Sequence, residues 1–114
     1  MSAFDLGAVS TFRELRVDKA QALKPLEEAA EVFGAYQNMM TCAETYSAVV
    51  DDVDGRAREI AEGAFMGYRE SMVDECADVC QAVANLLAAL GVDGDEWAAA
   101  IGRCEKRNRE RGRY

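Results

Sequence analysis

Apolar residues recur at helical spacing along much of the chain, most clearly in residues 71–91. At about 100° per residue, five of them fall within one broad stripe, as in a helix that turns one face towards a core. The stripe contains Val79, Val83, Leu86, Leu87 and Leu90. Gly91 is suited to end this helix, because glycine readily adopts the left-handed conformation of a C-cap. The pattern predicts one long helix over residues 56–90, with Gly63 and Gly67 as positions where it could kink or break.

A second apolar stripe follows Pro25. Proline is best tolerated in the first turn of a helix, so we expect a helix to begin near this residue. Its core-facing stripe would contain Leu26, Ala29, Ala30, Phe33, Tyr36 and Met40. The turn-like residues 51–55 would then separate this helix from the long one.

Two further helices are predicted nearer the ends of the chain. Thr11 and Glu14 have the spacing of a capping box, which predicts a first helix that begins there. Asp93 and Glu96 have the same spacing, which predicts a last helix. No stretch alternates convincingly between apolar and polar residues with a period of two. The expected fold class is therefore all-α, a bundle of about four helices in a single domain over residues 1–114.

The composition narrows the possible chemistry. The chain has 114 residues, a net charge of −8 and no histidine. Without histidine there is no Ser-His or Cys-His nucleophile pair and no His-bearing zinc site. The sequence has no uncharged run of membrane-spanning length and no signal-peptide pattern, so we expect a cytoplasmic protein that makes no membrane contact. Carboxylate chemistry assisted by a metal ion is compatible with all of these features.

Four carboxylates form two pairs at i, i+3 spacing: Glu28 with Glu31, and Glu75 with Asp78. Such pairs are usually solvated helix edges, and the first pair points nearly opposite to the apolar stripe of its own helix. Two helices that each offer two hard oxygen ligands would instead suit Mg²⁺, or Mn²⁺ in its place. This interpretation needs a second covered face on the first of these helices. It therefore predicts a bundle with an internal polar cleft or a homo-oligomer, either a dimer or a tetramer.

These motifs occur in an order typical of one protein family. The E-x-x-E pair, the E-x-x-D pair, Asn85, the L-G-V-D sequence of residues 90–93 and a basic C-terminal stretch together resemble the MazG-like all-α nucleotide pyrophosphohydrolases. The resemblance covers the chain from about Lys24 to its end. It implies a MazG-like bundle completed by oligomerisation. It also implies a Mg²⁺-dependent enzyme that cleaves a nucleoside or deoxynucleoside triphosphate to the monophosphate and pyrophosphate.

The resemblance implies a role for each candidate residue. The metal ligands would be Glu28, Glu31, Glu75 and Asp78. Either Glu31 or Glu28 would be the catalytic base, with Glu31 preferred. The substrate-binding residues would be Asn85, Arg103, Lys106, Asn108 and Arg109. Cys104 occupies a position where many relatives have lysine, so Arg103 or Lys106 would have to take over the role of that lysine.

The distribution of charge bears on the partner. The residues from Arg103 onward are rich in arginine and lysine, whereas the rest of the chain is strongly acidic. An acidic body repels a long nucleic acid, while a short polyphosphate that carries its own metal suits both parts. Two other functions stay open, namely a non-catalytic helical interaction module and a nucleotide-binding regulator without turnover. Release of pyrophosphate from a panel of nucleoside triphosphates would distinguish them from the enzyme.

Overall fold

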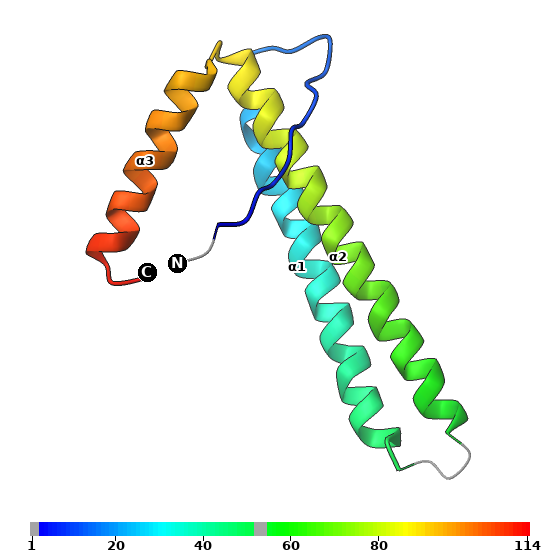
Figure 1. Cartoon of the computed structure of the whole chain (residues 1–114). Helices are drawn as coiled ribbons and strands as arrows, with labels where there is room; N and C mark the ends of the chain where they lie inside the picture. The colour runs from blue at the N-terminus through cyan, green and yellow to red at the C-terminus, as the bar shows by residue number, and fades with distance from the viewer. Residues whose placement is uncertain (1–2, 52–54) are drawn as a thin grey trace.

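The computed structural model describes residues 3–51 and 55–114, and the described part is all-α. It contains three helices, α1 (Lys19–Val49), α2 (Arg56–Ala89) and α3 (Gly94–Glu110), and no strand (Figure 1). The all-α class is thus confirmed. The expected bundle of about four helices is not confirmed, because the described residues form three helices. None of these helices has a stretch long and apolar enough to cross a membrane.

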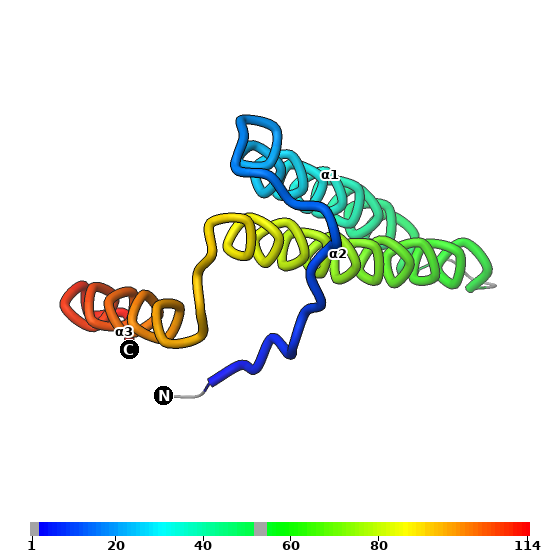
Figure 2. The backbone as a smooth tube through the Cα atoms, turned by 90° about the horizontal axis from the view of Figure 1, so that it is seen from above, coloured from blue at the N-terminus to red at the C-terminus, as the bar shows by residue number. Residues whose placement is uncertain are grey.

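The two long helices form an antiparallel hairpin. They lie side by side over most of their length (Figures 1 and 2). The less exposed positions alternate at spacings of three and four residues, which is the pattern of a coiled-coil seam. On α1 these positions are Gln21, Pro25, Glu28, Val32, Ala35, Met39, Cys42, Tyr46 and Val49. On α2 they include Ala61, Phe65, Met72, Glu75, Val79, Ala82, Leu86 and Ala89.

The predicted core face of α1 is wrong. Leu26 and Phe33, which were expected to face the core, are 68% and 59% exposed. The seam lies on another face of the helix, where smaller side chains let the two backbones approach. Ala35, Ala61 and Ala82 are the buried apolar residues of the described chain. As a consequence, Glu28 lies in the seam and a stripe of large apolar side chains faces outward.

The predicted first helix is also wrong, because residues 3–18 contain no helix. Residues 10–12 instead run across α2 and bond to its side chains (Figure 2). The backbone N–H of Phe12 donates to Asn85 Oδ1 at 3.0 Å, and Gln81 Nε2 donates to the Ser10 carbonyl at 2.8 Å. These bonds replace part of the hydrogen bonding that a helix would supply.

Helix α1 begins at Lys19, six residues before the predicted start. Asp18 caps it, since its Oδ1 accepts a hydrogen bond from the backbone N–H of Gln21 at 2.8 Å. Pro25 therefore lies inside the helix, in its second turn. A strong cap upstream outweighs the preference of proline for the first turn.

The prediction for α2 is confirmed, because the helix runs unbroken through Gly63 and Gly67. Gly91 ends it with φ of 72°. The N–H of Gly91 donates to the Ala88 carbonyl and that of Val92 to the Leu87 carbonyl, both at 3.0 Å, which is a Schellman motif. The break before α2 is confirmed as well. Two of its aspartates, Asp52 and Asp54, lie outside the described residues.

The last helix begins as predicted. The Asp93 side chain accepts a hydrogen bond from the N–H of Glu96 at 2.9 Å and caps α3. However, α3 packs against neither α1 nor α2 (Figure 1). The three helices therefore do not form a closed bundle within one chain.

The cap of α1 provides a test of the corrected helix start. Replacing Asp18 by Ala removes the acceptor for the Gln21 N–H and should lower the free energy of unfolding by about 1 kcal/mol. Asp18→Asn keeps a capping oxygen and should cost much less. Urea unfolding of the parent and both variants measures the difference. Equal stabilities of the Ala and Asn variants would show that the cap does not stabilise the hairpin.

Candidate metal centre

The four predicted carboxylates converge where one turn of α1 lies opposite one turn of α2. Glu28 and Glu31 come from α1, and Glu75 and Asp78 come from α2. One carboxylate oxygen from each residue can be chosen so that the four oxygens lie within 4.8 Å of one another. The convergence follows from the antiparallel packing, because each pair spans about one turn and both turns lie at the same level of the hairpin.

The cluster is partly shielded from solvent. Glu28 and Glu75 are half-buried at the seam, whereas Glu31 and Asp78 are exposed at its edge. The Oε2 atom of Glu75 is buried and has no hydrogen-bond partner among residues 3–51 and 55–114. A buried carboxylate oxygen without a donor costs free energy unless a positive group binds it.

Crowding of the carboxylates changes the titration of Glu31. The pKa of the Glu31 carboxyl is raised above its ordinary value of 4.5. The largest cause is a hydrogen bond shared with the Glu28 carboxyl, followed by one with Glu75 and by the negative charges of both. These carboxyls repel one another when all of them are ionised, so a proton is retained in the cluster at higher pH.

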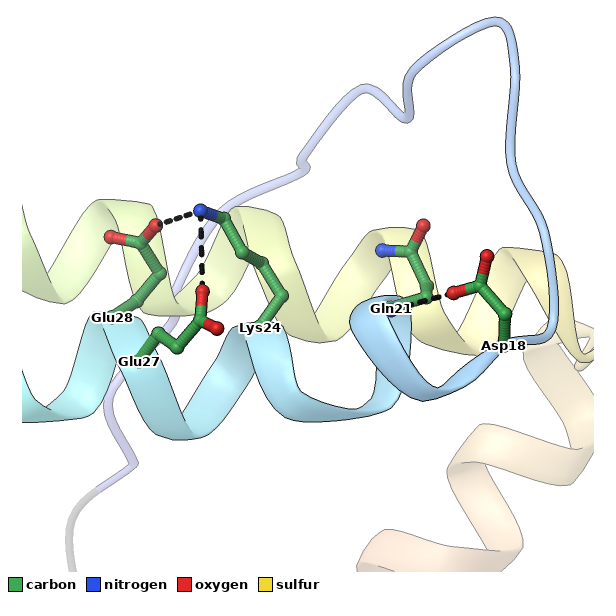
Figure 3. Close-up of polar contacts among 5 residues, drawn as sticks. All are labelled: Asp18, Gln21, Lys24, Glu27 and Glu28. Carbon is green, nitrogen blue, oxygen red and sulfur yellow. Dashed lines mark hydrogen bonds and ion pairs between the residues drawn. The ribbon is translucent and has the colours of Figure 1, made fainter.

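One cation lies at the edge of the cluster and was not singled out from the sequence. Lys24 Nζ lies 3.2 Å from Glu28 Oε1 and 3.6 Å from Glu27 Oε2 (Figure 3). The pKa of Lys24 is raised, chiefly by its hydrogen bond to Glu28. The signal in the sequence was the i, i+4 spacing of Lys24 and Glu28, which is common on solvated helices and therefore does not by itself indicate a site.

The donor set suits a hard divalent cation. All four candidate ligands are carboxylates, and oxygen ligands are the ones that Mg²⁺ and Mn²⁺ prefer. A divalent ion would offset the repulsion that raises the pKa of Glu31 and would give Glu75 Oε2 a partner. The residues present therefore fit the metal that was expected from the sequence.

Asn85 lies close to the cluster but is already engaged. It lines the same cavity as Glu28 and Asp78, and its side chain is only 4% exposed. Its Oδ1 accepts hydrogen bonds from the N–H of Phe12 and from Gln81 Nε2, each at 3.0 Å. In this structure its oxygen holds the N-terminal segment in place.

Four of the residues predicted to bind substrate are not brought to the cluster within one chain. They lie on α3, which does not pack against the hairpin. These residues are Arg103, Lys106, Asn108 and Arg109. The amide of Asn108 bonds within its own end of the chain, donating to Cys104 Sγ at 3.6 Å and accepting from Arg113 Nη1 at 3.1 Å.

No family model, curated protein or solved structure matches the chain. The arrangement itself defines what the site can do chemically. It offers four adjacent carboxyl groups beside Lys24 and a cavity. One of these groups, that of Glu31, has a raised pKa. Such a site can bind a divalent cation and accept a proton.

The raised pKa of Glu31 predicts a pH dependence of stability in the metal-free protein. The folded state binds this proton more tightly than the unfolded chain does, so the contribution is complete below pH 4.5 and is lost as the pH rises through the raised folded pKa. The parent should therefore lose stability relative to Glu31→Gln as the pH rises above 4.5 and through the raised pKa. Urea unfolding of metal-stripped protein across this range measures the effect.

Glu62→Gln is the matched control, because Glu62 is an exposed glutamate of α2 outside the cluster. Its pH profile should run parallel to that of the parent. If the Glu31→Gln profile also runs parallel to the parent profile, the carboxylates do not interact as described.

Proposed function

We propose that the protein is a Mg²⁺-dependent nucleoside triphosphate pyrophosphohydrolase of the MazG-like type, which forms a monophosphate and pyrophosphate. The observation that carries the proposal is the convergence of Glu28, Glu31, Glu75 and Asp78 at one level of the hairpin. The buried, unpartnered Oε2 of Glu75 adds support, because it suits a cation and not a solvated helix edge.

Each carboxylate has a role in this proposal. Glu28, Glu75 and Asp78 would hold the ion, with Glu31 at the edge of the same cluster. When bound, a divalent ion supplies positive charge to the phosphate oxygens and makes a nearby water easier to deprotonate. Glu31 is the preferred base, since its carboxylate is exposed at the edge of the cluster, beside the half-buried Glu28 and Glu75. It would take a proton from the attacking water.

Metal binding and turnover should both depend on the α2 pair. Glu75→Gln removes a charge from the half-buried part of the cluster and should abolish Mg²⁺-dependent pyrophosphate release from nucleoside triphosphates. In the parent, Mg²⁺ at 100 times its dissociation constant should stabilise the fold by about 2.7 kcal/mol, and the gain should be much smaller in Glu75→Gln. Pyrophosphate assays and thermal unfolding with Mg²⁺ or Mn²⁺ measure the two effects.

Glu62→Gln again serves as the control and should retain both responses. Turnover and metal stabilisation that persist in Glu75→Gln would remove Glu75 from the site. A parent with neither pyrophosphate release nor metal stabilisation would favour the non-catalytic interaction module, with the acidic pairs as solvated helix edges. Metal stabilisation in the parent without any pyrophosphate release would favour the nucleotide-binding regulator.

We also propose that the functional form is a homo-oligomer. The chain has an accessible surface of 8807 Å², whereas a compact monomer of this mass has about 6200 Å². Its radius of gyration is 19.1 Å, compared with about 13 Å for a compact chain of this length. An excess surface of this size is typical of chains that pack against a second copy.

The outward face of α1 is the best candidate for that contact. It carries Leu26, Phe33 and Tyr36, and the rings of Phe33 and Tyr36 stack with their centroids 6.0 Å apart. Pairing two hairpins through this face would give the four-helix arrangement that one chain lacks. The carboxylate cluster lies on the neighbouring seam and would become more enclosed.

The oligomer is tested by placing a charge on this face. Phe33→Glu should lower the mass measured by light scattering at micromolar concentration to that of a monomer, because an unpaired carboxylate would be buried at the contact. Asn38→Glu adds a negative charge on a different, exposed face of α1 and should leave the mass unchanged. A monomeric parent would contradict the proposal.

A further inference from the structure

A cavity of about 600 Å³ opens beside the carboxylate cluster. The N-terminal segment forms one wall, and the start of α1 and the C-terminal half of α2 form the others. Glu28 and Asp78 belong both to its lining and to the cluster. Its volume lies within the range of about 300 to 1,000 Å³ that is typical of small-molecule sites.

Residues 10–12, of which Phe12 lines the cavity, are held by a polar clamp and not by secondary structure. Gln81 Nε2 donates to both the Ser10 carbonyl, at 2.8 Å, and Asn85 Oδ1, at 3.0 Å. The same Asn85 oxygen accepts the N–H of Phe12 at 3.0 Å. Because Asn85 is buried, breaking this clamp would leave its amide oxygen without these donors. The clamp therefore fixes where Phe12 lies relative to α2.

The lining of the cavity is chemically divided. Lys24 and Arg16 line it, as do the carboxylates Glu14 and Asp18 outside the cluster. Lys24 pairs with the cluster residue Glu28 at 3.2 Å. Phe12 also lines it with a side chain that is 61% exposed. Cationic groups beside a metal-binding cluster suit phosphate oxygens, and an exposed aromatic ring suits a flat heterocycle.

We propose that this cavity binds the nucleoside half of the substrate, with the base stacked on Phe12 and the phosphates directed towards Lys24 and the carboxylate cluster. The inference rests on the proposed function and assigns a base-binding residue to it. Asn85 and Gln81 are positioning residues here, since they act through the segment that carries Phe12. The stacking contact accepts any base, because every base offers a flat face.

The decisive comparison is between Phe12→Ala and Phe4→Ala. Phe4 lies on the same N-terminal segment and is 87% exposed, but it does not line the cavity. Two probes are titrated by calorimetry in the presence of Mg²⁺: α,β-imido nucleoside triphosphates of the four common bases, and inorganic tripolyphosphate. Only the first kind carries a base.

Phe12→Ala should weaken the binding of the best nucleotide probe by about fivefold or more, which is the lower end of the range for loss of one stacked base. It should leave tripolyphosphate binding unchanged. Phe4→Ala should alter neither affinity. Gln81→Leu, which releases the clamp, should weaken nucleotide binding in the same selective way, while the far-UV spectrum of each variant stays that of the parent.

The failures of the two proposals are distinguishable. If the parent binds both probes and Phe12→Ala binds the nucleotide as tightly as Phe4→Ala does, the assignment of the cavity is overturned while the proposed function survives. If the parent binds neither probe with Mg²⁺, the proposed function is overturned and the cavity assignment with it. A parallel loss of both probes in Phe12→Ala would also overturn the assignment, because it would mean a structural role.

Discussion

The antiparallel packing of α1 against α2 is the constraint on which the site depends. It places one turn of each helix at the same level, and four carboxylate oxygens consequently lie within 4.8 Å of one another. The pKa of Glu31 is raised there, first by its hydrogen bond to the Glu28 carboxyl and also by the repulsion between like charges. Apolar side chains at Glu28 and Glu75 would pack better in a seam, so stability alone does not account for these residues. Binding of a cation would account for them.

The same packing leaves much of the chain uncovered. Small residues such as Ala35 and Ala82 bring the two helices close together, which makes the buried core thin and turns Leu26 and Phe33 outward. A hairpin of this kind buries one narrow stripe per helix, whereas the sequence supplies apolar residues for wider faces. The long shape and the large accessible surface follow from this thin core, and α3 packs against neither helix of the hairpin.

Local signals in the sequence were sufficient where a single interaction decides the structure. The end of α2 at Gly91 and the cap of α3 at Asp93 each depend on residues within a few positions, and both were predicted. The spacing of the two acidic pairs was also sufficient to indicate that they could meet. The convergence itself needed the register of two helices, which no local pattern contains.

Predictions failed where tertiary contacts compete with local preference. The core-facing side of α1 was predicted from its large apolar side chains. The helix instead packs against α2 through the face that contains Ala35. The capping-box spacing of Thr11 and Glu14 indicated a helix. Hydrogen bonds to Gln81 and Asn85 instead hold the backbone of Ser10 and Phe12 against α2. The side-chain amides that make these bonds lie about 70 residues away in the sequence.

The missing first helix has a consequence for the site. Because residues 3–18 contain no helix, the backbone groups of Ser10 and Phe12 are available to bond to side chains of α2. Asn85, which anchors the segment, lies on α2 seven residues after Asp78, or about two helical turns. One rigid helix therefore carries both a candidate metal ligand and the anchor of the cavity wall. The helix fixes the separation of Asp78 and Asn85. The N-terminal segment that is bonded to Asn85 is therefore held at a fixed position relative to the carboxylates, although the segment itself has no regular secondary structure.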